Sequence, residues 1–221
     1  KENAAVLAIY MLPGANAMEV AKSVKEAMEE ISKNFPEGMS YEIPFDMTTY
    51  ISDIEHYNSV LSRVANVKHS LVIGTADIKD LYVSAGGDSQ PFLAVLDALV
   101  RRGVEVRLLH AKEPGPAFQE DFDRYPMLIK HLQRRLCPRV HFKMIIFDCE
   151  TAYIGSANLT GAGIGMKSDG KRNFEAGILT DSLTLVDAAA EHFNSVWTGE
   201  HCKYCKRKAY CGDKIERKKK R

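Results

Sequence analysis

The chain has 221 residues, enough for one large domain or for a medium domain with a smaller one. Its 45% hydrophobic and 27% charged residues exclude a disordered chain, and its net charge of +1 excludes a field over the whole surface that would attract polyanions. No run approaches the roughly 20 apolar residues that cross a bilayer, and the start at Lys1 has neither Met nor a signal-peptide core. We therefore expect a soluble chain, with residues preceding Lys1.

The first fifty residues predict a small β-α-β fragment. Residues 4–12 are an apolar run typical of a strand, and apolar residues at helical spacing predict a helix over residues 17–33. Residues 39–45 predict a second strand. Such a fragment buries little surface, so we do not expect it to be stable alone.

From about Ser52 onwards, strand and helix patterns alternate. The predicted strands are 70–75, 104–109, 142–147, 151–154 and 174–179, and the predicted helices are 54–68, 92–102, 127–136 and 183–197. Residues 113–125 contain two prolines and are predicted to form a loop. The alternation, with one hairpin, predicts an α/β fold in which helices flank a mixed sheet.

One group of residues in this region suits phosphate chemistry. In a strand, His141 and Lys143 point to the same face while Phe142 turns to the other. Downstream, Gly155 allows close approach of a ligand to the backbone. The two polar side chains that follow it, Ser156 and Asn158, can donate hydrogen bonds.

An enzyme that attacks a phosphodiester must neutralise its anionic oxygens and offer a neutral nucleophile. Lys143 and Asn158 are our candidates for the first task, and His141 for the second. A nucleophilic imidazole needs an acceptor on its other nitrogen, and Glu175 is the candidate for that role. Residues 141–175 therefore predict one phosphate-cleaving site.

These residues resemble a known motif. The spacing His141-x-Lys143-x4-Asp148-x6-Gly155-Ser156-x-Asn158 is similar to the HxKx4Dx6GSxN signature of the phospholipase D superfamily, and the wider resemblance covers residues 70–197. It implies a phospholipase D-like fold and a two-step mechanism without a catalytic metal, through a phosphohistidine intermediate. It also places Asp148 in the motif, mostly as a carboxylate that orders the loop, and a simple turn residue is an equal alternative.

The chain has one copy of the motif, whereas the mechanism needs two histidines. His110-Ala111-Lys112 has the His-x-Lys spacing but lacks the Asp and the Gly-Ser-x-Asn that should follow. Members of the superfamily with one motif pair two chains around one active site. The resemblance therefore implies a homodimer.

A second resemblance covers the beginning of the chain. Residues 5–51 are similar to part of the porter domain of resistance-nodulation-division efflux pumps, through Pro-Gly-Ala-Asn-Ala from residue 13, Phe-Pro-Glu-Gly-Met from residue 35 and Pro-Phe-Asp-Met from residue 44. No membrane helix follows, so we expect no transport. The expected domains are a porter-like fragment over 1–51, a phosphodiesterase domain over 52–200 and a Cys-rich basic tail over 201–221.

The tail suggests a metal site. Cys202 and Cys205 have the Cys-x2-Cys spacing that grips tetrahedral Zn²⁺. Cys211 is the expected third ligand, and His201, Cys137 or Cys149 the fourth. An iron–sulfur cluster and plain free thiols are the alternatives. Five cysteines, crowded as these are, favour a reducing compartment, and we expect the cytoplasm.

Three functions remain open for this site. The first is a nuclease, which the single motif, the small domain and nine basic residues among positions 206–221 favour. The second is a phospholipase D acting on phospholipid head groups. The third is a module that binds nucleic acid or a protein partner without catalysis, and the intact motif argues against it.

Overall fold

The computed structural model describes residues 17–41, 47–79, 81–85, 88–165 and 167–213. The chain divides into two compact units, Lys1–Phe45 and Asp46–Arg221, so the division lies six residues before the boundary expected after residue 51. In the described part of the first unit, α1 (Ala17–Ser32) forms the predicted helix. Residues 39–41 are not a strand, and the strands expected at 4–12 and over 42–45 lie outside the described residues.

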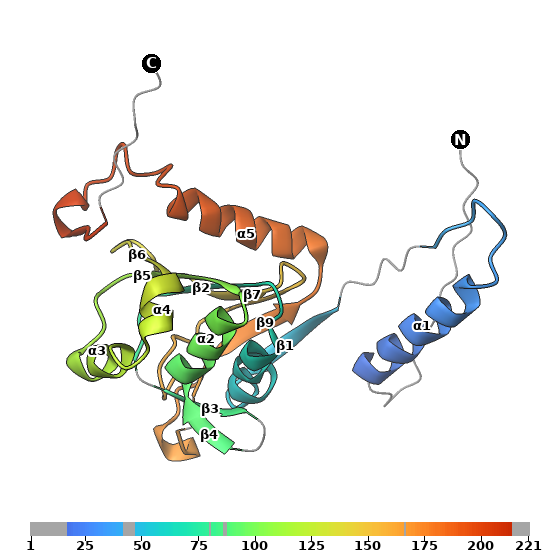
Figure 1. Ribbon diagram of the computed structural model, residues 1–221, viewed down its shortest axis with the longest axis horizontal. Helices are drawn as coiled ribbons and strands as arrows, with labels where there is room; N and C mark the ends of the chain where they lie inside the picture. Colours follow the sequence, from blue (N-terminus) through green and yellow to red (C-terminus); the bar gives the residue numbers. More distant parts are fainter. Residues whose placement is uncertain (1–16, 42–46, 80, 86–87, 166, 214–221) are drawn as a thin grey trace. The chain divides into compact units, whose positions relative to one another are not determined.

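The second unit is built on a seven-stranded sheet in the order β1-β9-β8-β7-β2-β5-β6 (Figure 1). The strands are β1 (Thr48–Ser52), β2 (Ser70–Thr75), β5 (Glu105–His110), β6 (Gln133–Leu136), β7 (Lys143–Phe147), β8 (Thr151–Gly155) and β9 (Ala176–Thr180). β2, β5 and β6 are parallel, and the other neighbours are antiparallel. The predicted mixed sheet is therefore confirmed.

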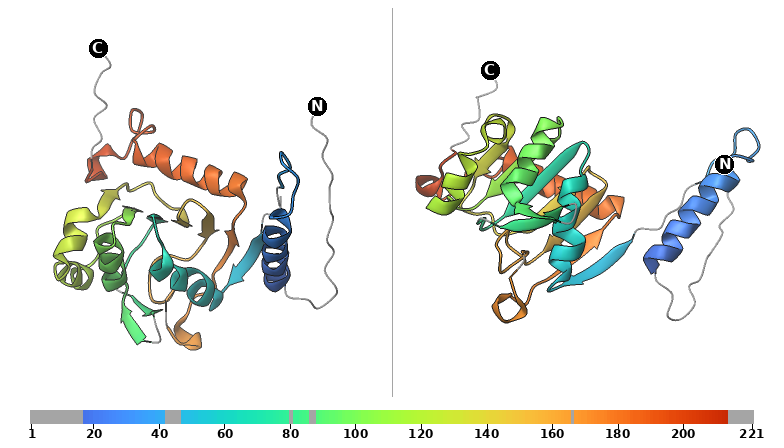
Figure 2. Two further views of the ribbon diagram at one scale, coloured as in Figure 1. Left: turned by 45° about the vertical axis from the view of Figure 1, so that its right-hand side comes forward. Right: turned by 60° about the horizontal axis from the view of Figure 1, so that its bottom comes forward.

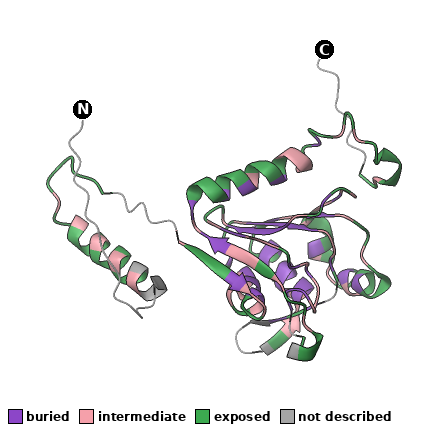
Figure 3. Ribbon diagram, turned by 180° about the vertical axis from the view of Figure 1, so that it is seen from behind, coloured by how far each residue is buried: buried purple, intermediate pink, exposed green. Residues whose placement is uncertain are grey.

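Helices cover both faces of this sheet (Figures 1 and 2). One face carries α2, α4 and two short irregular helices, and the other carries α5. Their bounds are η1 (His56–Val60), η2 (Leu61–Asn66), α2 (Phe92–Arg101), α4 (Pro126–His131) and α5 (Leu183–Trp197). The outer side of α5 is exposed to solvent (Figure 3).

The central strand β7 shows why the sequence folds this way. All five of its residues are buried, because helices cover both of its faces. Ile145 and Phe147 pack in the core on the α2 side, whereas Met144 and Ile146 pack in the core on the α5 side. The two cores follow from the alternation of side chains along a strand.

Three parts of the fold differ from the sequence prediction. Residues 127–136 do not form one helix, because residues from Gln133 pair with β5 as the parallel edge strand β6. The predicted loop 113–125 contains α3 (Pro116–Phe122), whose two phenylalanines at helical spacing are buried. The strand β1 and the hairpin of β3 (Tyr82–Ala85) and β4 (Asp88–Pro91) were not predicted.

The directions of the strands bring many ends together. The carboxyl ends of β1, β2, β5, β6 and β8 and the amino ends of β7 and β9 lie along one side of the sheet, which we call the site edge. The turn between β7 and β8 lies at the opposite edge. Because β7 has five residues, the two edges are roughly 16 Å apart. No helix of the described residues is long and apolar enough to cross a membrane.

Candidate active site

The amino end of β7 holds the first two candidate residues at the site edge. Lys143 is the first residue of the strand and is 8% exposed, and its ammonium donates a hydrogen bond to the backbone carbonyl of His141 over 2.8 Å. His141 itself is exposed. Phe142 lies on the opposite face, where the centroid of its ring is 5.1 Å from that of the His192 ring of α5. The alternation therefore leaves His141 and Lys143 together on the other face.

Asn158 is held by the carboxyl end of β2. Its Oδ1 accepts a hydrogen bond from the backbone N–H of Asp77 at 3.1 Å, and the Thr75 hydroxyl lies 3.3 Å from the same oxygen. Among the described residues, no partner occupies the amide nitrogen Nδ2. This arrangement fixes the carboxamide so that its N–H groups are free to donate to a ligand oxygen.

Glu175 and Ser156 form a second polar pair across β8 and β9. The Ser156 hydroxyl and the Asn173 side-chain amide both donate to the Glu175 carboxylate. In addition, the backbone N–H of Ala176 donates to the Ser156 hydroxyl at 3.0 Å. No hydrogen bond joins Glu175 to the His141 ring in the part of the chain that the structure describes.

The register of the sheet nevertheless brings Glu175 toward His141. Lys143, Gly155 and Gly177 lie in one row across β7, β8 and β9. His141 and Glu175 lie beyond the paired residues; if the register is continued by two residues, they align two strand spacings apart, about 10 Å between backbones. Two long side chains can close that distance. A contact between this carboxylate and the imidazole is therefore within reach of side-chain rotation.

The two glycines of this row are required by a tyrosine. The ring of Tyr153 lies over Gly155 and Gly177, so that a Cβ at Gly177 would stand 2.7 Å from Cε2 of the ring. Tyr153 is 1% exposed, and burial raises the pKa of its hydroxyl far above the usual value. The neutral, buried side chain of Tyr153 therefore packs against the row of Gly155 and Gly177, beside Lys143.

Asp148 lies away from these residues, in the turn at the opposite edge. Its carboxylate accepts hydrogen bonds from the backbone N–H groups of Lys68, His69 and Ser70, at 2.7 to 3.2 Å. Burial acts to raise the pKa of Asp148, but these three amides together lower it. β7 separates the Asp148 carboxylate from His141, and three backbone amides hold it, so its geometry is that of a carboxylate that orders a loop and not of one that contacts the substrate.

The second His-x-Lys spacing is not a half-site. His110 is completely buried, and its Nε2 accepts a hydrogen bond from the Arg134 guanidinium at 2.8 Å. Its Nδ1 donates to the carbonyl of Lys112 at 2.7 Å, so both ring nitrogens are occupied. Burial lowers the pKa of His110, which keeps the ring neutral. His110 therefore cannot reach or protonate a substrate.

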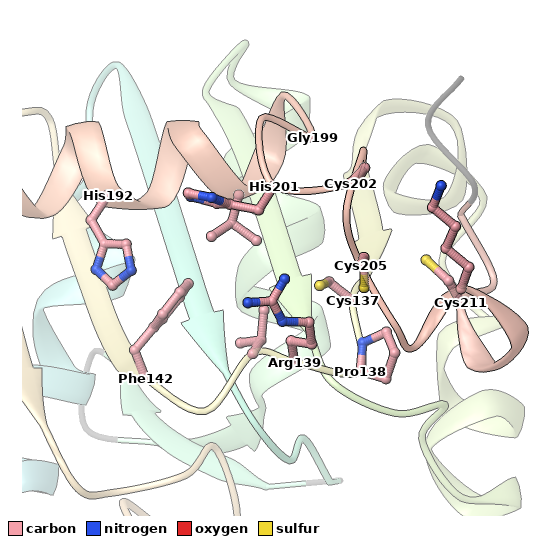
Figure 4. Close-up of a pocket in the computed structure, with 13 residues that line it drawn as sticks. Cys137, Pro138, Arg139, Phe142, His192, Gly199, His201, Cys202, Cys205 and Cys211 are labelled. Carbon is pink, nitrogen blue, oxygen red and sulfur yellow. The ribbon is translucent and has the colours of Figure 1, made fainter. Parts of the chain in front are cut away.

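One of the residues expected to bind metal lies far from the others. Cys137, Cys202, Cys205 and Cys211 line one pocket between the tail, α5 and the segment before β7, together with His201 (Figure 4). Cys149 is exposed in the turn at the opposite edge, 3.7 Å from the Ser70 hydroxyl. Cys149 is therefore excluded as the fourth ligand.

Sequence reasoning missed three residues that support the site. Thr75 holds Asn158, and Tyr153 packs against the glycines beside Lys143. His56 is completely buried and meets the Tyr153 ring edge-on at 5.3 Å, and its Nδ1 lies 3.1 Å from the carbonyl of Asp53. A threonine ending a buried strand was the only signal for Thr75, and nothing in the local sequence marked His56.

The fold and the motif at the site edge define a domain of the phospholipase D class. The chain belongs to the family of phospholipase D-like domains, since the family model described as "Cardiolipin synthase, PLD-like domain" matches residues 61–197. Residues 1–77 are similar to the AcrB/AcrD/AcrF family, in agreement with the resemblance to efflux pumps. The two matches overlap between residues 61 and 77.

Two solved structures support the same fold. NucT from Helicobacter pylori aligns with a TM-score of 0.51 and 14% identity, over 68% of this chain and 95% of that one. Nuc from Salmonella typhimurium, described as a phospholipase D family member, aligns with a TM-score of 0.52 and 21% identity, over 69% of this chain and 95% of that one. At these identities the likeness shows the fold alone.

Proposed function

We propose that the chain is a nuclease that hydrolyses phosphodiesters through a phosphohistidine. A ring nitrogen of His141 attacks phosphorus, and Lys143 and Asn158 neutralise the oxygens that gain charge. The leaving oxygen takes a proton from a second histidine. Water then attacks the phosphohistidine and releases a phosphomonoester and the free imidazole, while the second histidine removes the proton from that water.

The observation that carries this proposal is that three polar groups lie along the same site edge. The imidazole of His141 and the buried ammonium of Lys143 come from the start of β7, and the carboxamide of Asn158, whose oxygen is already satisfied, comes from the turn after β8. Burial strengthens the electrostatic interaction of Lys143 with an anion, because little water screens it. Glu175 would orient the attacking imidazole, with Ser156 holding the carboxylate.

Nucleic acid is favoured by the rim of this site. Phe174, next to Glu175, is 96% exposed, which is unusual for a large apolar side chain. Lys167 and Lys171 are exposed in the segment that leads to it. Aromatic rings that stack on bases, beside cations that attract the backbone, are the combination that binds single strands.

The second histidine is expected from another copy of the chain. His110 is unavailable, and the other His-x-Lys pair, at His201 and Lys203, is not followed by the Asp and the Gly-Ser-x-Asn of the motif. Two site edges facing each other across a two-fold axis would place His141 of the partner subunit on the far side of the same phosphorus. We therefore propose a homodimer with one shared active site.

The nuclease proposal is tested by parallel assays on single-stranded DNA, duplex DNA, RNA and phosphatidylcholine vesicles, with EDTA present because no metal takes part in the proposed chemistry. His141→Asn should abolish hydrolysis, and His131→Asn, at an exposed position on α4, is the matched control. Phe174→Ala should reduce cleavage of single-stranded DNA more than cleavage of a small aryl phosphodiester. Equal effects on both substrates would argue against base stacking.

Two rival functions give different results in the same assays. The family model is named for cardiolipin synthase, which favours phospholipid as the second substrate class, and head-group release from vesicles without DNA cleavage would establish it. A non-catalytic module would bind nucleic acid without hydrolysing any substrate. Any hydrolysis that His141→Asn removes rejects the module.

The shared site is tested by mixing subunits. Co-expression of the unmodified chain with an equal amount of His141→Asn should leave about one quarter of the activity, because only dimers with two intact chains carry both histidines. A monomeric enzyme would keep about half of the activity.

The cytoplasmic location remains a prediction, consistent with five free cysteines.

A further inference from the structure

Four cysteines come together at the site edge from two distant parts of the chain. Cys137 follows β6, and Cys202, Cys205 and Cys211 belong to the tail after α5. All four line one pocket of about 350 Å³ (Figure 4). All four are free thiols and none is fully exposed. Thiols from separate elements that share a pocket are candidates for joint coordination of a soft metal.

The tail is fixed to the segment around Cys137 by several contacts. The Asp213 carboxylate accepts a hydrogen bond from the backbone N–H of Leu136 at 2.6 Å. The Arg207 guanidinium donates to the carbonyl of Pro138 at 3.4 Å, and the Cys211 thiol lies 3.8 Å from the carbonyl of Leu136. The residues on both sides of Cys137 therefore already touch the tail.

The backbone around Cys202 and Cys205 is shaped for a thiolate. The N–H of Cys205 donates to the carbonyl of Cys202 at 3.2 Å, which closes the turn of the Cys-x2-Cys unit. The N–H of Arg207 donates to the sulfur of Cys205 at 3.4 Å, and this amide is the main reason that the pKa of Cys205 is lowered. An amide directed at sulfur stabilises the charged form that binds metal.

The pKa of Cys211 depends on the neighbouring thiols. Burial raises the pKa of Cys211, and the neighbouring Cys137 and Cys202 raise it further, which shows that these two side chains lie close to Cys211. Arg139 and Lys208 also line the pocket and would offset part of the charge of four thiolates. A divalent ion supplies the rest.

The other candidate ligands fit less well. Cys149 is at the opposite edge, and the Nε2 of His201 lies 3.4 Å from the Ser195 hydroxyl at the end of α5. As the side chains are placed, no three His, Cys, Asp or Glu of the described residues could hold a metal ion. Coordination at the sulfur–zinc distance of about 2.3 Å therefore requires rotation of the thiols toward a common centre.

We propose that Cys137, Cys202, Cys205 and Cys211 bind one Zn²⁺ and that this ion ties the tail to the segment leading into His141. Cys137 is one of the three fourth ligands that the sequence left open, and it is chosen here in place of His201 and Cys149. Cys137 is four residues before His141, and the intervening Val140 is buried. The ion would hold in place the segment that leads into β7. Its effect on catalysis by His141 rests on the proposed function.

The experiment is metal analysis of the purified full chain and its variants by mass spectrometry. We expect about one zinc per unmodified chain, and loss of that zinc in Cys137→Ser and Cys205→Ser. Cys149→Ser and His201→Ala are matched controls that should keep it. Cobalt reconstitution of the unmodified chain is the second measurement: the intensity of its sulfur-to-cobalt absorption should correspond to four thiolates, whether or not the variants fold.

Four results would overturn the proposal. These are a chain without zinc whose thiols all react with a disulfide reagent under native conditions, full zinc in folded Cys137→Ser, loss of zinc in folded His201→Ala, and the visible absorption of an iron–sulfur cluster. None of these readouts depends on hydrolysis. A failure of the zinc proposal and a failure of the nuclease proposal are therefore distinguishable.

Discussion

The backbone N–H of Asp77 donates a hydrogen bond to Oδ1 of Asn158, although 81 residues separate the two in the chain. Thr75 supports this contact from the end of β2, since its hydroxyl donates to the carbonyl of Asp77 at 2.8 Å and lies 3.3 Å from both the same oxygen and the backbone nitrogen of Leu159. Thr75 and the backbone of Asp77, which were not predicted as site residues, therefore orient the side chain of Asn158, which was.

Thr75→Val should lower kcat by about 10-fold, because losing the hydroxyl that holds the Asp77 turn in place beside Asn158 removes roughly 1 to 1.5 kcal/mol of transition-state stabilisation. KM should change little if the contact matters mainly after binding. Thr75→Ser keeps the hydroxyl and should recover most of the rate. Steady-state kinetics on single-stranded DNA measure the difference, and equal kcat values for Thr75→Val and the unmodified chain would exclude this positioning role.

Gly177→Ala should lower the free energy of unfolding by about 1 to 3 kcal/mol, because the added Cβ overlaps rigid neighbours in a packed core. The Cβ would stand 2.7 Å from the Tyr153 ring and 2.8 Å from the carbonyl of Ile154. Gly115→Ala is the control, since nothing lies within 4 Å of a Cβ there. Urea denaturation of both variants tests the prediction, which fails if the two lose the same stability.

Asp148→Asn should destabilise the chain at neutral pH by about 1 to 2 kcal/mol, a modest value because the carboxylate is partly exposed. The pKa of Asp148 is lowered in the folded state, so its contribution is complete above the unfolded pKa of about 3.9 and is lost as pH falls through the lower, folded pKa. The difference between variant and unmodified chain should therefore shrink in acid. Urea titrations at neutral and strongly acidic pH measure it, and a gap that stays constant would contradict the mechanism.

His56→Phe should make stability less sensitive to mild acid. Burial lowers the pKa of His56, while the Asp53 carbonyl and the charges of Glu175 and Asp53 partly oppose the shift. Below the ordinary value of 6.5 the unfolded chain binds a proton that the folded chain does not, so stability falls as pH drops from 6.5 toward the folded pKa.

Phenylalanine cannot take up this proton and can keep the edge-on contact with Tyr153. The slope of unfolding free energy against pH, measured between roughly pH 5 and pH 7, should therefore decrease in His56→Phe. His131→Ala, at an exposed position, should leave the slope unchanged. An unaltered slope in His56→Phe would show that His56 takes up its proton without unfolding.

Part of the fold could be read from local patterns. The strand 70–75 and the helix 183–197 were predicted with their observed limits, because a continuous apolar run and a long helical period each depend on neighbouring residues alone. Residues 133–136 could not be read in this way. Their pattern Gln-Arg-Arg-Leu has no strong period, and only pairing with β5 makes them a strand.

The sequence by itself determined the family of the domain and which side chains carry the proposed chemistry, because fixed spacings around His141, Lys143 and Asn158 are local facts. Only the tertiary structure decided what surrounds them. In the folded chain Asp148 lies at the opposite edge of the sheet, His110 is buried and Cys137 lies next to the tail. Thr75 and Tyr153 support the site residues. These contacts join residues that are far apart in the chain, and the order and direction of strands in the sheet, which no local pattern encodes, set which of them meet.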